Sequence, residues 1–511
     1  MTLRAGNGGP TLGPMADETF FVLGDQLSVD VAPWTTMSTE TIILMVESEV
    51  LINAPRHLTR TALYVSAMRA FAAQVSALGY RVDYRRAPTF AQGIADHRAQ
   101  YDPDRIVMNH PRGRRATRIF HDLGVELLPD PFYLTTLAEF KEILASKKRP
   151  SMEQFYRSQR RKLDVLMDGD QPLGGRWNFD EENRKPLPRD GGQWPEPWSR
   201  QLTNEERQVV DELGDDHPGA DALMWWPRTR DDALAQLADA VERIIPHFGP
   251  HEDAASSSNW HLAHSRLSVA LNLGLLHPQE VVESVIIAHD EGRIPLASAE
   301  GFIRQVIGWR EWVWAWHQVN NDEYRSSNVL GATESLPRSW RDMEHHEMAC
   351  LDAVLGHLRD FGWNHHIERL MVLANAATLA GIDPLQLNDW MAENFVDGAE
   401  WVMEANVLGM GTYADGGLMS TKPYIAGGNY LKKMTNFCKT CRFAPTERIG
   451  EQACPLTNGY WNFLLKQEVV LRTNHRMAPQ LRAASKRDDR YEILAESEEK
   501  RSIVLGSTAV R

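Results

Sequence analysis

The sequence predicts an α/β N-terminal domain with a doubly wound parallel sheet, followed by a large all-α domain. The first 135 residues alternate short apolar runs of strand length with segments of helical periodicity, a pattern typical of parallel sheets. From about residue 231 onward the strand patterns vanish and the spacing of apolar residues becomes helical throughout. A chain of 511 residues is also too long for one hydrophobic core, so more than one domain is expected.

Four apolar runs in the first domain have the length of buried strands, namely FFVLGD (20–25), TIILMVES (41–48), RIVMNH (105–110) and VELLPD (125–130). Parallel sheets of this kind bind ligands beyond the carboxyl ends of their strands. We therefore expect a pocket near Gly24, Asp25, Gln26, Glu47, Glu49 and Asn109. The first strand is not followed by GxGxxG, so the dinucleotide-binding fingerprint is absent.

Composition shifts along the chain indicate five regions. We expect a disordered tail at 1–18, the α/β domain at 19–135, a Gly/Pro/Trp-rich connector at 136–230, the all-α domain at 231–478 and a polar C-terminal tail at 479–511. Helical periodicity in the α-domain falls at 231–246, 278–291, 298–318, 343–360, 364–380 and 384–402.

The composition is that of an ordinary globular protein, with 43% hydrophobic and 24% charged residues. No window approaches the run of about 18 apolar residues that a membrane span needs, and the first residues lack a signal-peptide core. Four cysteines in so long a chain argue against a disulfide-stapled secreted protein, so we expect a cytoplasmic one. The net charge of -14 gives no global hint of nucleic-acid binding. One basic stretch between Lys147 and Lys162 is either a DNA contact or a solvated helix face.

Three of the four cysteines lie close together, as Cys438-x2-Cys441 followed by Cys454, while Cys350 stands alone upstream. Four thiolates suit either tetrahedral zinc or a 4Fe-4S cluster, and unliganded buried thiols are the plain alternative. The isolated fourth cysteine and the Cys454-Pro455 pair favour iron slightly over zinc. A redox CxxC lacks the neighbouring βαβ pattern and leaves Cys454 unexplained.

Several motifs resemble one known family. The stretches GFIRQVIGWRE (301–311) and GWNHHIERLM (362–371) are similar to two flavin-domain helices of the photolyase/cryptochrome family. With MEQFYRSQRRK, GGRWNFDEENR, TKPYIAGGNYLKKM and the four cysteines, the chain resembles the bacterial iron–sulfur branch, which includes the prokaryotic (6-4) photolyases. The likeness runs from residue 23 to about 478 and implies an antenna-binding α/β domain and an FAD-binding α-domain.

The resemblance implies a set of flavin contacts. HSRLS matches the segment that binds the flavin phosphates, where free N–H groups of a helix start would meet the pyrophosphate. Arg369 and Asp397 match an ion pair beside the isoalloxazine ring, where a cation stabilises the reduced flavin. The full set is His264, Ser265, Leu267, Ser268, Gln305, Arg310, Arg369, Asp397 and Asn406.

The catalytic residues implied by the resemblance are His366, His365, Trp309 and Trp390. His366 takes the place of the histidine that gives a proton to the photoproduct, a role suited to a group that exchanges protons near neutral pH. Trp309 would stack on the extruded lesion, and Trp390 would begin electron delivery, extended by Trp340 or Trp363. Leu370 replaces the second histidine of the animal enzymes, so a two-histidine mechanism is not expected.

Two further cofactors follow from the resemblance. The branch carries 6,7-dimethyl-8-ribityllumazine as its antenna, for which Asp25, Glu47 and Glu49 are available carboxylates. It also carries a 4Fe-4S cluster, for which Cys350, Cys438, Cys441 and Cys454 are the expected ligands.

We therefore expect a (6-4) DNA photolyase, a carbon–carbon lyase that uses blue light to repair UV-damaged DNA. We expect it to be a monomer and not to associate with a membrane. A cryptochrome-type photoreceptor with the same cofactors is the alternative, favoured by Met391, Ala399 and Met403, which depart from the tyrosines and the acidic residue of the branch. A zinc-stabilised DNA-binding protein without light chemistry is the third hypothesis.

Overall fold

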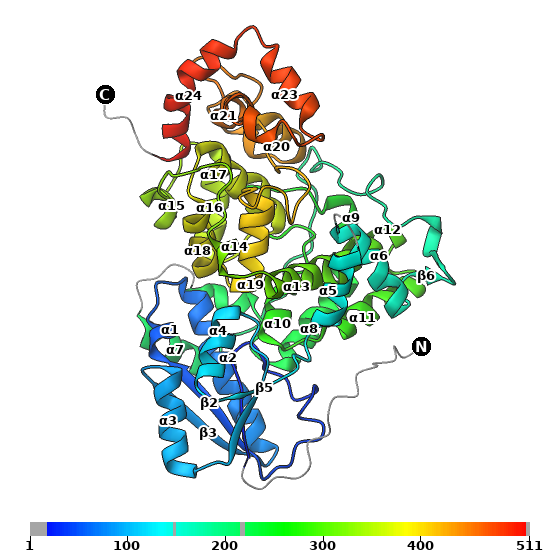
Figure 1. Cartoon of the computed structure of the whole chain (residues 1–511). Helices are drawn as coiled ribbons and strands as arrows, with labels where there is room; N and C mark the ends of the chain where they lie inside the picture. The colour runs from blue at the N-terminus through cyan, green and yellow to red at the C-terminus, as the bar shows by residue number, and fades with distance from the viewer. Residues whose placement is uncertain (1–17, 147–149, 215–219, 507–511) are drawn as a thin grey trace. The chain divides into compact units, whose positions relative to one another are not determined.

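The computed structural model describes residues 18–146, 150–214 and 220–506 (Figure 1). Most of the predicted N-terminal tail, and Lys147, Lys148 and Arg149 of the basic stretch, lie outside the described residues. The chain divides into two compact units. Unit 1 comprises residues 1–177, 197–246 and 265–318, and unit 2 comprises residues 178–196, 247–264 and 319–511. Helical residues up to 318 therefore group partly with the sheet, in contrast to the predicted boundary at 230.

Unit 1 is built on a five-stranded parallel sheet with the order β3-β2-β1-β4-β5. Phe20 of β1 pairs with Ile43 of β2 on one side and with Val107 of β4 on the other. The chain runs outward to β3 and then crosses back to β4, so the order reverses at β1, as in doubly wound sheets. The predicted fold class is confirmed. The strands are β1 Glu18–Phe21, β2 Ile42–Ser48, β3 Arg81–Ala87, β4 Arg105–Asn109 and β5 Glu126–Leu128.

Several helices of unit 1 begin at residues whose side chains accept hydrogen bonds from free backbone N–H groups. Ser151 accepts a hydrogen bond from the backbone of Gln154, and Thr203 forms a capping box with Glu206. The helices are α1 Glu49–Ile52, α2 Leu58–Ala77, α3 Phe90–Tyr101, α4 Arg114–Asp122, α5 Leu137–Ser146, α6 Met152–Leu163, α7 Asn204–Leu213, α8 Arg230–Asp239, α10 Ser268–Leu273, α11 Pro278–Asp290, α12 Leu296–Ile303, the π-helical η4 Arg304–Arg310 and α13 Glu311–Val319.

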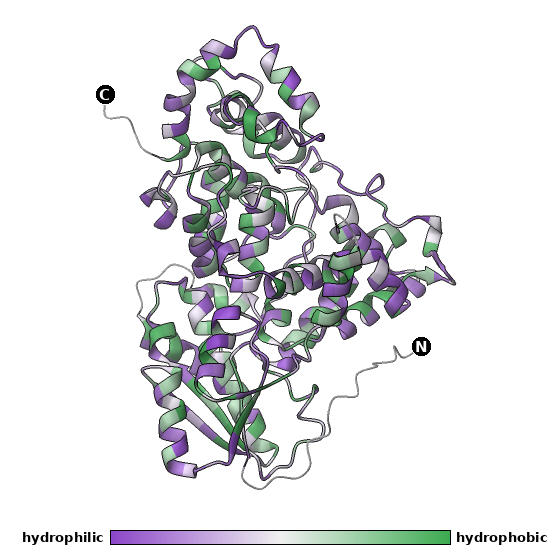
Figure 2. Cartoon of the chain, in the orientation of Figure 1, coloured by the Kyte–Doolittle hydropathy of each residue, from purple (hydrophilic) through white to green (hydrophobic). Residues whose placement is uncertain are grey.

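Unit 2 is helical and encloses one large hydrophobic core. Its helices end and begin at expected signals: Gly362 adopts the left-handed conformation after α16, and Asp383 with Pro384 starts α18. Along the helices hydrophobic and hydrophilic residues alternate (Figure 2). They are α14 Asp322–Arg325, α15 Arg338–Arg341, α16 Ala349–Phe361, η5 Glu368–Ala374, α17 Asn375–Ala380, α18 Pro384–Asn394, α19 Glu400–Met403, η6 Glu404–Gly411, α20 Gly428–Met434, η7 Phe437–Lys439, α21 Pro455–Lys466, α22 Glu468–Leu471, α23 Ala478–Ser485 and α24 Arg490–Val504.

The C-terminal region differs from the polar tail expected after residue 478, because α23 and α24 pack as part of unit 2. Ile493 and Val504 of α24 are buried, and the carbonyl of Val504 accepts the indole N–H of Trp340. Lys500, although charged, is also buried and donates to the carbonyl of Gly450. Two apolar anchors in a charged helix are too few for sequence periodicity to reveal this packing. In the described part of the chain, no helix has the length and apolarity that crossing a membrane requires.

Gly93 provides a test of the packing of α3 against the sheet. A Cβ atom at Gly93 would lie 2.8 Å from both Cγ atoms of Val46 on β2. Gly93→Ala should therefore destabilise unit 1 by about 1–3 kcal/mol, measured as a lower midpoint of thermal unfolding by circular dichroism. In a Val46→Ala background the same change should cost nothing, because the clashing methyl groups are gone. Equal losses in both backgrounds would contradict this packing.

Candidate functional site

The four cysteines converge in unit 2 from three places in the chain. Cys350 lies in the first turn of α16, Cys438 and Cys441 lie in and after η7, and Cys454 directly precedes α21. All four line one small cavity. Burial raises the pKa of Cys350 well above its usual value and that of Cys438 to about 12, and the charges of the neighbouring thiolates add to both shifts. Such a set fits a tetrahedral thiolate centre, whose positive ions would offset this cost.

The loop that carries Cys441 and Cys454 is held by the C-terminal helices. The N–H of Gly450 donates to Glu496 of α24 at 2.8 Å, and Arg448 forms an ion pair with Asp489. Gly428 leaves room for the cysteines, because a Cβ atom there would lie 2.9 Å from the sulfur of Cys454. The cavity therefore depends on Gly428 and on helix α24, both of which lie outside the cysteine pattern.

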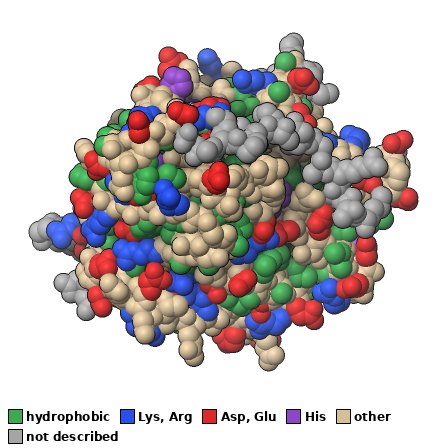
Figure 3. Space-filling view, turned by 90° about the horizontal axis from the view of Figure 1, so that it is seen from below, with side chains coloured by type: hydrophobic (Ala, Val, Ile, Leu, Met, Phe, Trp, Pro, Cys, Tyr) green, Lys and Arg blue, Asp and Glu red, His purple; other side chains and the backbone are tan. Residues whose placement is uncertain are grey.

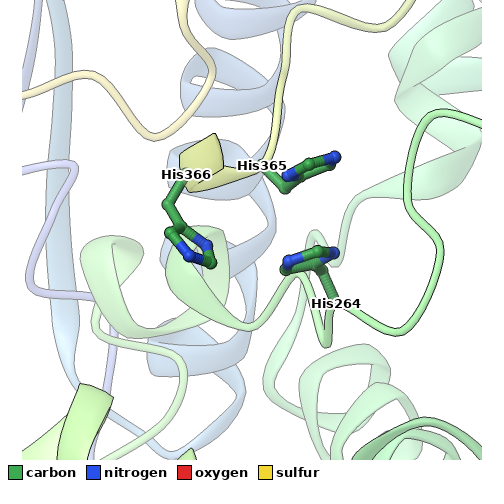
Figure 4. Close-up of side chains that lie close together, drawn as sticks. All are labelled: His264, His365 and His366. Carbon is green, nitrogen blue, oxygen red and sulfur yellow. The ribbon is translucent and has the colours of Figure 1, made fainter. Parts of the chain in front are cut away.

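His366 is the accessible member of a group of three histidines in unit 2 (Figure 4). Its side chain is 50% exposed, and its Nε2 lies 3.6 Å from Oδ1 of Asp253. Asp253 also lies 3.8 Å from Nε of Arg184. Burial alone would raise the pKa of Asp253, but the hydrogen bond and charge of His366 with Arg184 outweigh burial, and the pKa is lowered. A carboxylate is thus held in its charged form beside an exposed imidazole, as a general acid requires.

His365 and His264 are buried and stack on each other, with ring centroids 4.1 Å apart and planes 5° from parallel (Figure 4). Burial lowers the pKa of His264 to about 3 and that of His365 well below its usual value, so both rings are neutral. The two ring nitrogens of His264 each lie 3.0 Å from a backbone carbonyl, those of His261 and Glu252. A neutral ring carries one N–H, so His264 donates to one of these carbonyls and its other nitrogen keeps a lone pair.

The predicted ion pair between Arg369 and Asp397 is formed in unit 2, with an N···O distance of 2.9 Å. Asp397 also accepts the indole N–H of Trp363 at 3.2 Å. The guanidinium of Arg369 lies over the ring of Phe395, 4.1 Å from its centroid. Arg369 is thus fixed in orientation by a carboxylate and an aromatic face.

Trp390 lies on α18 beside Trp340, with ring centroids 6.2 Å apart. Trp363 instead packs edge-on against Trp260 and bonds to Asp397. Of the two expected extensions of the electron route, Trp340 is therefore the neighbour of Trp390.

Two of the three positions that depart from the branch are buried, and the third, Ala399, is partly exposed. Met391 and Met403 are each 2% exposed. Glu404 is fully buried and lies 3.5 Å from Arg325, so it does not replace the acidic residue expected at 403.

The remaining flavin and lesion residues lie in unit 1. Ser268 begins α10, and Gln305 on η4 donates to the carbonyl of Gly301. Arg310 donates to the carbonyl of Phe132 and lies over the ring of Tyr133. Trp309 is partly exposed, in contrast to the buried Trp312, Trp314 and Trp316. The predicted flavin set is thus divided, with Ser265, Leu267, Ser268, Gln305 and Arg310 in unit 1 and His264, Arg369, Asp397 and Asn406 in unit 2, where Asn406 donates to the carbonyl of Val402.

The three expected antenna carboxylates lie in different surroundings. Glu47, at the end of β2, lines a cavity of about 320 Å³ beside α2 and α7, and it binds Arg69 at 2.8 Å and the hydroxyl of Tyr84 at 2.5 Å. Glu49 does not line this cavity, and it pairs with Arg86. Asp25 does not line it either.

Asp25 belongs to a buried group at the carboxyl ends of β1 and β4. Its Oδ1 and Nη2 of Arg112 are buried without a hydrogen-bond partner in the described structure. Burial raises the pKa of Asp25, while the charge of Arg112 opposes the shift. A buried carboxylate oxygen and a buried guanidinium nitrogen without hydrogen bonds each need a polar partner, such as water or a ligand group.

The described cations of the basic stretch singled out in the sequence have different surroundings. Arg157 pairs with Glu153, Lys162 pairs with Glu139, and Arg160 is fully buried with its guanidinium on backbone carbonyls. Arg161 is exposed and lies over the ring of Trp177. On the face seen in Figure 3, basic and acidic side chains are interspersed among the described residues. Arg157 and Lys162 are thus neutralised by carboxylates at the surface.

Sequence reasoning missed Asp253 and Arg184, which flank His366 but lie far from it along the chain. A lone Asp after a Glu, in HEDAAS, carries no signal of its own.

Comparison with known proteins agrees with this geometry. The family described as Deoxyribodipyrimidine photo-lyase-related protein matches residues 20–226. The chain is 37% identical to a (6-4) photolyase of Agrobacterium fabrum over 478 residues, 89% of this chain and 93% of the relative. A shorter match, 38% identical over 92 residues, covers 18% of this chain and 60% of an uncharacterized protein of Acanthamoeba polyphaga mimivirus.

Among solved structures, a bacterial class III photolyase from Agrobacterium tumefaciens matches with a TM-score of 0.56 over 98% of both chains, at 14% identity. The fold is therefore that of a photolyase. From the matched sequence and fold together, the chain belongs to the photolyase/cryptochrome family, with the bacterial (6-4) photolyases among its relatives.

Proposed function

We propose that this protein is a (6-4) photolyase that uses FAD and blue light to repair the (6-4) photoproduct in UV-damaged DNA, as a monomer in the cytoplasm. Homology supports photolyase-type DNA repair in general. The observation that carries the narrower proposal is the half-exposed His366 beside the charged Asp253.

In this proposal each residue of the site has a separate role. His366 gives a proton to the lesion and takes it back, and Asp253 orients the imidazole. His365 supports His264 from behind by stacking, with a neutral ring. Trp309 supplies an exposed aromatic face for an extruded base.

Bound FAD would supply the light-driven electron, and several groups suit it. Arg369, held by Asp397, offers a fixed cation to the reduced ring, and Asn406 and Gln305 offer amides. Trp390 and Trp340 are adjacent aromatic rings of the kind that relay electrons to a photoexcited flavin.

The four cysteines are proposed to hold a 4Fe-4S cluster with a structural role. They pack in or against the hydrophobic core of unit 2, and the loop between Cys441 and Cys454 is hydrogen-bonded to α24 at Gly450. The cavity at Glu47 is proposed to hold the lumazine antenna, since its volume suits a small heterocycle and its lining is charged.

A cryptochrome-type photoreceptor remains the second candidate on one observation. Met403 is buried where the branch has an acidic residue, and Glu404 is turned to Arg325. Normal survival after ultraviolet exposure in cells lacking the protein, together with a partner recovered only after blue light, would favour signalling.

His366→Asn should lower the rate of (6-4) repair by about 10²- to 10⁴-fold, because a positioned general acid is lost. The measurement is light-dependent loss of the lesion from an oligonucleotide, at equal flavin absorbance. His345→Asn is the matched control, since His345 is 88% exposed and pairs only with Asp352 among the partners described. A His366→Asn protein that repairs at the control's rate would remove His366 from the mechanism.

Gly428→Ala should cost the cluster without removing a ligand, because the added Cβ meets the Cys454 sulfur and the Pro445 carbonyl, each at 2.9 Å. We expect lower iron content and soluble yield, measured by iron analysis of the purified protein. Gly356→Ala on α16 is the control, since its nearest atom is 3.7 Å away and belongs to a flexible arginine. Full iron content in Gly428→Ala would contradict the site.

Glu47→Gln should reduce the amount of lumazine that copurifies, measured by its fluorescence after release from the protein. Glu49→Gln should leave the amount unchanged, because Glu49 does not line the cavity. Equal occupancy in the two variants would argue for another antenna site, such as the group around Asp25.

A further inference from the structure

A concentration of positive charge in unit 2 lies near the end of the chain, in residues 466–487, here called the basic segment. It holds six basic residues and one acidic residue, Glu468, so its net charge is 6 − 1 = +5 in a chain whose net charge is -14. The basic residues are Lys466, Arg472, Arg476, Arg482, Lys486 and Arg487.

The cations of the basic segment differ in their ion pairing from Arg157 and Lys162, which both have carboxylate partners. Within the described ranges, only Arg487 of the basic segment forms an ion pair, with Asp489 at 2.7 Å. The other five are exposed and have no carboxylate within ion-pair distance among the described residues. An unpaired surface cation keeps its whole charge available to an anionic partner, whereas a paired one first has to give up its carboxylate.

The five exposed cations stand on an ordered support. Lys466 ends α21, Arg472 follows α22, Arg476 precedes α23, and Arg482 and Lys486 lie on and directly after α23. Buried apolar residues anchor these short elements in the core, namely Leu471, Met477, Leu481 and Ala484. The charges are therefore displayed in a fixed arrangement.

This support is joined to the loop at residues 412–427, between η6 and α20. Asn474 donates from its side chain to the hydroxyl of Tyr413 and to the carbonyl of Thr421, both at 3.1 Å. Further along the same loop, burial raises the pKa of Tyr424, Arg184 and Arg476 oppose the shift, and Asp253 adds to it. Tyr424 thus lies within electrostatic reach of both Arg476 and Asp253, the partner of His366. The loop at residues 412–427 therefore contacts the basic segment through Asn474.

We propose that the face formed by Lys466, Arg472, Arg476, Arg482 and Lys486 binds the phosphates of the DNA duplex that flanks the lesion. The inference rests on the proposed function for its substrate and adds the surface that takes it. Phosphate contacts fix the register of a duplex, and each one releases counterions, which makes the affinity depend on salt. The surface would hold the strand while the damaged base reaches His366.

The test is the salt dependence of binding to an undamaged duplex in the full-length protein. For Arg472→Ser/Arg476→Ser/Arg482→Ser, the slope of log K against log salt concentration should become shallower by about 2–3, at about 0.9 per lost phosphate contact. Arg157→Ser/Lys162→Ser/Arg338→Ser is the control of equal charge change, because all three of its cations are already paired. Its slope should change by less than about 1.

The same slope in the triple variant and in the unmutated protein would overturn the proposal, as would an equal change in variant and control.

Repair assays distinguish failure of the DNA-binding surface from failure of the proposed repair function. The triple variant should raise KM for a lesion in a duplex and leave repair of an isolated (6-4) dinucleotide unchanged, because the dinucleotide has no flanking phosphates. Loss of dinucleotide repair in the variant would contradict a role limited to flanking DNA. If the unmutated protein repairs neither substrate, the proposed function is wrong. The salt slopes still show whether the five exposed cations bind DNA phosphates.

Discussion

Four cysteines that meet in one cavity, two of them buried, are the constraint on which unit 2 depends. Burial raises the pKa values of Cys350, Cys438 and Cys454 and so favours their protonated forms, which have no attraction that would bring the sulfur atoms together. Two features of the chain allow the sulfur atoms to come together. Gly428 leaves space beside Cys454, and hydrogen bonds with the α24 region hold the loop at Gly450. Metal–thiolate bonds would supply the remaining free energy, and they would join α16, η7 and α21 into one body.

The proposed proton transfer takes place elsewhere in the same unit, where burial lowers pKa values instead of raising them. His264 and His365 are deeply buried, which keeps both rings neutral, while His366 remains half exposed beside Asp253. Two adjacent histidines at one helix start thus meet different surroundings, one buried and the other open to solvent. In the proposed function, the exposed ring is the one that a substrate can reach.

The sequence was sufficient for what depends on local pattern. Alternating apolar runs predicted the parallel sheet from β1 to β5, and helical periodicity predicted the helical domain that follows. Pairings between distant residues were beyond reach, as with Asp253 and His366, because no local signal links them. Counting charges left the basic stretch open between a DNA contact and a solvated helix face, because Lys162 pairs with Glu139, which lies 23 residues away along the chain. Arg472 and Arg476 have no such carboxylate among the described residues. Helix α24 was missed because Ile493 and Val504 are too few to set a period.

The central claim is that His366 and its surroundings serve repair of one lesion. It is tested most directly by illuminating the reduced, flavin-loaded protein with two oligonucleotides, one carrying a (6-4) photoproduct and the other a cyclobutane dimer. The account predicts light-dependent restoration of the first and no change in the second, because proton donation is required only where an atom group must be transferred back. Restoration of the cyclobutane dimer alone, or of neither lesion with flavin and iron both present, would contradict it.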